Sequence, residues 1–124
     1  MRIFDYTNNG GKNLILDYID SLDDITKEAI YDARELIFVH GMKGLESLNC
    51  RKLYKKIYEL KIKNQRLAYF VKNDSIYFIH AFKKQKNKTE KKDINIVKQR
   101  YSMLVKGEQY AICWKKSKKR KKNY

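Results

Sequence analysis

The segment YELKI-KNQ-RLAYFV-KND-SIYFIHAF, residues 58–82, decides the fold that this sequence predicts. Its apolar residues alternate with polar ones or form short runs, a pattern typical of β-strands. The polar triplets at 63–65 and 72–74 have the length and composition of turns. We therefore expect three consecutive antiparallel strands, Tyr58–Ile62, Arg66–Val71 and Ser75–Phe82, that form a meander.

The residues before this segment predict one strand and two helices. Arg2–Thr7 is rich in strand formers and is followed by a turn cluster. Apolar residues recur at the spacing of one helix face from Leu14 to Leu22 and again from Ile25 to Val39. Asp23 or Asp24 can cap the second of these helices. We expect the two helices to pack as an antiparallel hairpin.

The residues after the meander predict a last helix and a tail. Thr89 can cap a helix whose apolar residues extend from Ile94 to Val105. Lys115–Lys122 contains seven basic residues, and such a block repels itself and is usually disordered. Helices segregated from a mostly antiparallel sheet make an α+β fold. We expect one domain over residues 1–107 and a flexible basic tail over residues 108–124.

The positive charge is concentrated in the last third of the chain. The 124 residues carry a net charge of +15. Residues 83–124 hold 16 Lys and Arg against 3 acidic residues, whereas residues 1–82 hold 13 against 11. Charge of this size indicates partners rather than fold. Nucleic acid is the leading partner, because neutralised phosphates release counterions; an acidic protein or an anionic membrane surface could also exploit the charge.

The cysteines, histidines and N-terminus suggest a cytoplasmic protein without a metal or other cofactor. Cys50 and Cys113 form no CxxC pair, so we expect free thiols, with a disulfide as the alternative. Two His and two Cys share no ligand-like spacing. The N-terminus has no apolar signal core, and no apolar run approaches the ~18 residues of a membrane span. We expect no membrane partner.

Several short motifs follow one another in a fixed order along the chain. They are the helix LILDYIDSL at 14–22, and the stretches Ile57–Ile62, Arg66–Tyr69, His80–Lys84 and 86–92. Together they resemble the phage-derived HigB branch of the RelE/ParE toxin superfamily, which typically reads LYELR, then R-x-x-Y, then HGF-x-KK and a K-T-P-K-K-E-type helix start, after a similar first helix. The resemblance covers roughly Leu14 to Val105.

Three residues depart from the family pattern. Lys61 stands where Arg is common, Ala81 replaces a Gly, and Glu90 replaces the Pro at the start of the last helix. Glu90 still suits a helix N-terminus, where negative charge is favoured. The resemblance implies a microbial-RNase-like α+β fold and a toxin of a type II toxin-antitoxin system that cuts mRNA, usually on the ribosome. It also implies a cognate antitoxin, of the helix-turn-helix HigA-like kind, that masks the basic face.

Arg66 and His80 are the first candidates for catalysis. Metal-independent RNA cleavage uses the substrate's 2′-OH as nucleophile and needs an acid, a base and cations that hold the phosphate. Arg66 can clamp phosphate oxygens bidentately, and His80 has the ordinary pKa of a general acid or base. His80 alternates with Phe78 and Phe82. We therefore expect all three side chains on one face, which would draw His80 inward.

Glu59, Lys61 and the lysines after the meander complete the candidate site. Glu59 and Lys61 share the strand face opposite Leu60. Glu59 could act as the base or fix the basic groups, with an ordinary surface salt bridge worth under ~1 kcal/mol as the alternative. The expected phosphate and rRNA contacts, for which a solvated basic loop is the alternative, are Lys83, Lys84, Lys86 and Lys88.

Two other functions fit the same sequence. ParE-like relatives of this fold are gyrase poisons, as the resemblance implies, and a basic tail suits a non-catalytic nucleic-acid-binding module. Glu59, Arg66 and His80 on neighbouring strands favour the nuclease over both. A degenerate phage protein that folds without catalysing a reaction is the third alternative, which Lys61 and Ala81 keep open.

Overall fold

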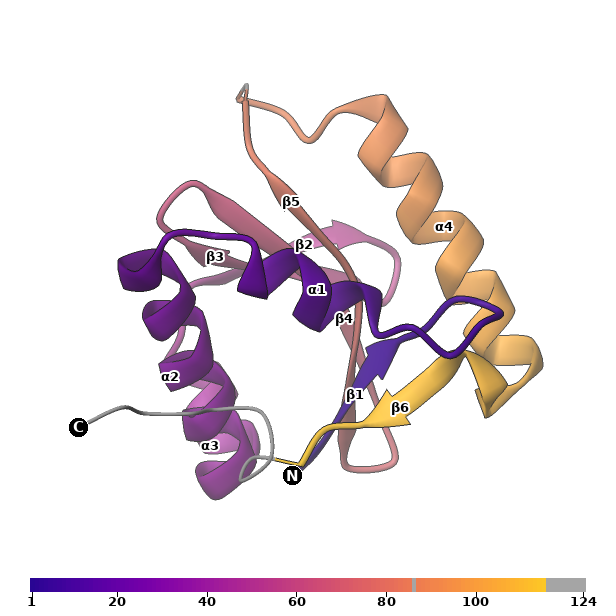
Figure 1. Cartoon of the computed structure of the whole chain (residues 1–124), viewed down its shortest axis with the longest axis horizontal. Coiled ribbons are helices and arrows are strands. Elements are labelled where there is room, and N and C mark those ends of the chain that lie inside the picture. The colour runs from indigo at the N-terminus through magenta and orange to yellow at the C-terminus, as the bar shows by residue number, and fades with distance from the viewer. Residues whose placement is uncertain (86, 116–124) are drawn as a thin grey trace.

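A six-stranded mixed sheet with helices on both faces forms the protein (Figure 1). The computed structural model describes residues 1–85 and 87–115. The strand order in the sheet is β2-β3-β4-β5-β1-β6. In chain order the elements are β1 (Arg2–Tyr6), α1 (Leu14–Asp20), α2 (Asp24–His40), α3 (Met42–Glu46), β2 (Cys50–Tyr54), β3 (Ile57–Ile62), β4 (Gln65–Lys72), β5 (Ser75–Lys83), α4 (Lys91–Lys106), the 3-10 turn η1 (Glu108–Tyr110) and β6 (Ala111–Cys113).

The predicted meander is confirmed as β3, β4 and β5. Both pairings are antiparallel, and each predicted strand end lies within one residue of the observed one. In the β4–β5 turn, Asn73 and Asp74 have φ angles of 51° and 61°. Two consecutive left-handed residues are typical of the two-residue hairpin turn, whose twist matches that of its strands. β1 pairs in parallel with β5, which makes the sheet mixed. The other strand pairs are antiparallel, and the α+β fold class is confirmed.

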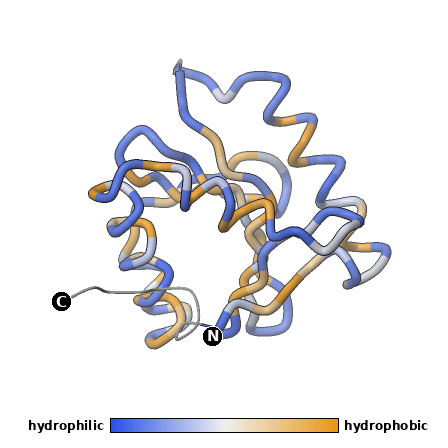
Figure 2. The backbone as a smooth tube through the Cα atoms, in the orientation of Figure 1, coloured by the Kyte–Doolittle hydropathy of each residue, from blue (hydrophilic) through white to orange (hydrophobic). Residues whose placement is uncertain are grey.

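The helices are divided between the two faces of the sheet. In Figure 1, α2 and α3 lie to the left of the sheet and α4 lies to the right. One hydrophobic cluster joins α1, α2 and α3 to Leu60, Leu67 and Phe78, and a second joins α4 to Ala68 and Ile79. Figure 2 shows hydrophobic and hydrophilic residues alternating along α4, as a helix with one buried face requires. The sheet therefore separates two cores.

The chain continues in the fold past Gly107, where a tail was expected. η1 is followed by β6, which pairs antiparallel with β1. The side chain of Trp114 is 3% exposed, and its backbone N–H donates to the carbonyl of Ile3 at 2.7 Å. The predicted boundary was therefore too early, because a short apolar edge strand gives a weak signal next to a long basic run. The basic run itself lies outside the described residues, apart from Lys115.

The predicted helix starts were partly right. Asp23 caps α2, since its carboxylate accepts from the backbone N–H of Thr26 at 3.1 Å. α4 begins after Glu90 without a side-chain cap, so Thr89 does not have the expected role. The Thr89 hydroxyl instead donates to Oε2 of Glu59 at 3.3 Å. α3 and β2 were not predicted.

Candidate active site and nucleic-acid interface

A β-bulge in β5 decides where His80 points. Tyr69 pairs with Phe78, but the preceding residue of β4, Ala68, pairs with His80, so Ile79 is an extra residue in β5. An extra residue reverses the alternation of side chains beyond it. Phe78 therefore lies in the α1–α2 core, whereas His80 faces α4. The expectation that Phe78 and His80 share a face was wrong.

His80 lies beside Phe82 on the α4 side. Their ring centroids are 5.1 Å apart and the rings are nearly parallel, at 18°. Phe82 pairs with Arg66 across the strands, and His80 pairs with Ala68. Arg66 and His80 are thus diagonal neighbours on one face, a relation in which long side chains come within reach of each other. The bulge brings the histidine to the face that carries the candidate phosphate clamp.

Glu59 and Lys61 lie on this same face, as predicted from their spacing. Glu59 pairs with Ala68 on β4, and Lys61 pairs directly with Arg66. Leu60, between them, is fully buried in the opposite core. Two cations directly opposite each other in a sheet repel. The Lys61–Arg66 pair therefore favours an anion as its ligand over a purely structural role.

Glu59 is a fully buried carboxylate that holds other side chains in place. Its Oε1 accepts from Nε of Arg51 at 2.5 Å and lies 4.0 Å from Nε of Arg66. Its Oε2 accepts from Thr89 at 3.3 Å. Each carboxylate oxygen is thereby turned toward a protein group rather than toward solvent. This geometry supports a positioning role for Glu59.

An open depression of about 510 Å³ lies at the end of the sheet where β3 turns into β4. Arg66 donates through Nη1 to the carbonyls of Lys63 and Gln65, at 3.0 and 2.9 Å, which fixes its head group at the rim. Five of the lining residues are cationic, and none of the described lining residues is acidic. The lining residues are Arg51, Lys61, Lys63, Asn64, Arg66, Lys84, Gln85 and Asn87.

Lys84, one of the lysines expected to bind phosphate, lies among other cations. Burial lowers the pKa of its ammonium, and Arg51, Arg66 and Lys61 act in the same direction, whereas Glu59 opposes them. An anion bound here would relieve that repulsion. Lys83 and Lys88 are exposed but do not line the depression, and Lys86 lies outside the described residues.

His80 makes its own carboxylate contact. Nε2 lies 2.8 Å from Oδ1 of Asp93 in the first turn of α4, and both side chains are nearly buried. Because a carboxylate only accepts, this bond assigns the proton of the neutral ring to Nε2 and leaves Nδ1 with a lone pair. Burial lowers the pKa of His80, helped by Arg100 and opposed by Asp93. A neutral imidazole at neutral pH has the protonation state of a general base.

The structure thus unites most of the predicted site and adds two residues to it. Arg66, Lys61 and Lys84 surround the depression with Glu59 behind them, while His80 lies on the same face but does not line it. Sequence reasoning missed Arg51 and Asp93. Arg51 belongs to the unpredicted strand β2. Asp93 was not considered, because an acidic residue in the first turn of a helix is common and gives no separate signal of a site.

Residues 1–85 and 87–115 contain two free cysteines and no cluster of metal ligands. Among these residues, His, Cys, Asp and Glu form no group of three that could hold a metal ion. Cys50 and Cys113 are both free. No helix in these two ranges is long and apolar enough to cross a membrane.

The fold and the site define a small basic α+β protein with a depression lined by cations on one face of its sheet. Residues 17–102 match the model of the family described as Phage derived protein Gp49-like (DUF891). The chain belongs to this family, which is part of the RelE/ParE-like toxin group. None of the curated proteins compared with the chain matches it.

Proposed function

We propose that this protein is the toxin of a type II toxin-antitoxin system and acts as a HigB-like endoribonuclease, an mRNA interferase. The observation that carries this proposal is the placement of Arg66 and His80 as diagonal neighbours on one sheet face, beside a depression lined by cations. A DNA-gyrase poison of the same group would need no neutral histidine beside a phosphate clamp. Membership of the RelE/ParE-like group supports the toxin part of the proposal.

The proposed reaction needs only the RNA's own hydroxyl group as nucleophile. The 2′-oxygen attacks the adjacent phosphorus while Nδ1 of His80 takes the 2′ proton. Arg66 and Lys61 hold the phosphate oxygens as negative charge grows on them. The bond from phosphorus to the 5′-oxygen breaks, and Lys84, whose pKa is lowered, is the candidate donor of the proton to that oxygen. The products are a 2′,3′-cyclic phosphate and a 5′-hydroxyl.

The other side chains of this face support these steps. Glu59 orients Arg51 and Arg66, and Asp93 orients His80. Phe82, stacked beside His80, offers a flat ring against which an RNA base can stack. Lys83, Lys86 and Lys88 continue the basic surface along the chain toward mRNA or ribosomal RNA. An antitoxin that covers this face would neutralise the toxin.

The test is cleavage of a translated mRNA, mapped by primer extension, with wild type and an Arg66→Ala, His80→Ala double variant. We expect new RNA 5′ ends with the wild type and none with the double variant. A general base contributes roughly 10²–10⁴-fold to rate, so His80→Ala alone should lower cleavage by about that factor. Lys72→Ala removes an exposed lysine at the far end of β4 and should cleave like wild type.

Two results would overturn the proposal. One is growth arrest by the double variant when circular dichroism shows that this variant is folded. The other is intact mRNA in arrested cells together with inhibited DNA supercoiling, which would identify the chain as a ParE-like gyrase inhibitor. Running the reaction on purified ribosomes and on free mRNA separates cleavage on the ribosome from cleavage of free RNA.

A further inference from the structure

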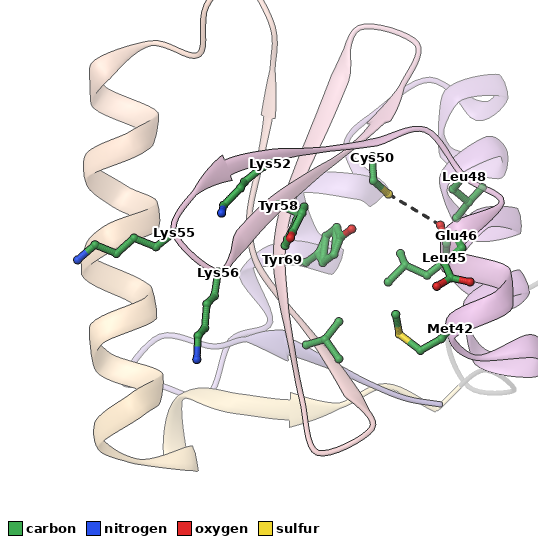
Figure 3. Close-up of a pocket in the computed structure, with 11 residues that line it drawn as sticks. Met42, Leu45, Glu46, Leu48, Cys50, Lys52, Lys55, Lys56, Tyr58 and Tyr69 are labelled. Carbon is green, nitrogen blue, oxygen red and sulfur yellow. Dashed lines mark hydrogen bonds between the residues drawn. The ribbon is translucent and has the colours of Figure 1, made fainter.

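A second depression, of about 550 Å³, opens on the other face of the sheet, beside α3 (Figure 3). Its floor is apolar and partly open to solvent. Met42, Tyr58 and Val71 are 42%, 40% and 41% exposed, respectively. Large apolar side chains exposed together are typical of surfaces that bind another protein. The apolar lining residues are Met42, Leu45, Leu48, Tyr58, Tyr69 and Val71.

Lysines surround one side of this apolar floor. Figure 3 shows Lys52 and Lys56 on the strand side, across from the α3 side chains, whereas Lys55 points away, with its ammonium over the ring of Tyr54 at 5.3 Å. Glu46 is the one acidic residue among the described residues that line the depression. An occupant that fits must therefore present apolar side chains to the floor and carboxylates to the lysines. Met42 adds adaptability, since its unbranched side chain fills irregular gaps.

The charge of this chain excludes two obvious occupants. A second copy carries the same net charge of +15. The chain's own C-terminal run, Lys115–Lys122, brings seven basic residues and no acidic ones. Both would place like charges against Lys52 and Lys56, which is costly. Nucleic acid would also be attracted to the lysines. Of the described lining residues, however, only Tyr58 offers an exposed aromatic ring on which a base could stack, so nucleic acid fits the apolar floor poorly.

We propose that this depression binds an acidic amphipathic helix of a partner protein. The helix would lay its apolar face over Met42, Tyr58 and Val71 and direct its carboxylates toward the lysine side. This proposal goes beyond the nuclease function and does not depend on it. Because the cationic depression lies on the opposite face of the sheet, a partner bound here leaves Arg66 and His80 uncovered.

The experiment is an NMR titration of the full-length, ¹⁵N-labelled chain with a synthetic helix of roughly four turns that has Leu on one face and Glu on the other. We expect amide shifts at Leu45, Cys50 and Val71. One control peptide replaces Glu with Lys, and a second replaces Leu with Ser; both should bind more weakly. Val71→Glu should weaken binding roughly tenfold or more. Ile25→Glu, which adds the same charge at a residue 73% exposed on α2, should leave binding unchanged.

Three outcomes would overturn the proposal. The first is shifts confined to Lys61, Arg66 and Lys84, which would indicate simple attraction to the cationic depression. The second is equal weakening by Val71→Glu and Ile25→Glu. The third is the same shifts at Leu45, Cys50 and Val71 on titration with single-stranded RNA. RNA cleavage by Val71→Glu should equal that of wild type, so peptide binding and the nuclease proposal succeed or fail separately.

Discussion

Nε2 of His80 on β5 lies 2.8 Å from Oδ1 of Asp93 in the first turn of α4. This contact joins the sheet to the helix that covers it, and the β5 bulge makes it possible because it turns His80 toward α4. It fixes the ring orientation and assigns the ring proton to Nε2. The orientation of the proposed base, Nδ1, therefore depends on Asp93, for which we propose no contact with RNA.

Asp93→Asn tests this positioning role. The amide can offer a donor to Nε2, which would favour the wrong tautomer, so we expect RNA cleavage to fall by about 10²-fold. The substitution also removes an interaction that raises the pKa of His80. The acid limb of the pH–rate profile should therefore shift to lower pH. Asp74→Asn, in an exposed turn, is the matched control, and an unshifted acid limb with full activity would contradict the role.

The stability of the protein should depend on pH through His80. Its pKa in the folded state is lowered from the ordinary 6.5. As pH falls below that value, the unfolded chain takes up the proton first, so the free energy of unfolding decreases until the folded pKa is reached. Urea unfolding from about pH 7.5 to about pH 5 measures this slope. His80→Gln should flatten it, whereas His40→Gln, at an exposed helix end, should retain it.

Glu59→Gln should destabilise the protein by roughly 1–3 kcal/mol. The side chain is fully buried and accepts from Arg51, so the neutral amide leaves Arg51 and Arg66 without their carboxylate. Added salt should restore part of the lost stability, because it screens the repulsion between the two guanidinium groups. Chemical unfolding at low and high salt measures both effects. Glu46→Gln, an exposed residue, should change little, and equal effects of the two variants would contradict the assigned network.

Trp114→Ala should cost about 3–5 kcal/mol of stability. The ring is buried, lies edge-on to Phe38 at 5.8 Å, and covers the guanidinium of Arg34 at 4.9 Å. Trp114→Phe should cost less, because it keeps an aromatic ring at this position. Because Trp114 is the only tryptophan, its replacement removes the tryptophan fluorescence signal. Thermal unfolding followed by circular dichroism therefore measures the change in stability. Ile112→Ala, at a residue 45% exposed on β6, is the control.

Lys84→Ala should weaken binding of single-stranded RNA and reduce its salt dependence. Each phosphate contact contributes about 0.7 to the slope of log affinity against log salt for single strands. The slope should therefore fall by about that amount if Lys84 neutralises one phosphate. Fluorescence anisotropy with a labelled oligonucleotide measures it, using Lys72→Ala as the control. Identical slopes for the two variants would exclude Lys84 from the interface.

Local patterns predicted much of the fold. Strand alternation and polar turns located β3, β4 and β5, because side-chain period and turn chemistry are properties of adjacent residues. For the same reason the cap of α2 was narrowed to Asp23 or Asp24, and the structure shows that it is Asp23. β2 and β6 were missed. Both are short edge strands, whose existence depends on pairing with β3 and β1 rather than on their own composition.

The sequence by itself determined which side chains share a strand face wherever the strands are regular, as with Glu59 and Lys61. Motifs that occur in order along the chain also predicted the RelE/ParE-like group, to which the matched Gp49-like family belongs; the HigB branch within that group stays a prediction. Only the tertiary structure decided that His80 faces α4, that Asp93 meets it, and that Arg51 joins Glu59. The physical reason is that a single extra residue in β5 reverses the alternation, and a bulge is set by the pairing of β5 with β4 across the sheet.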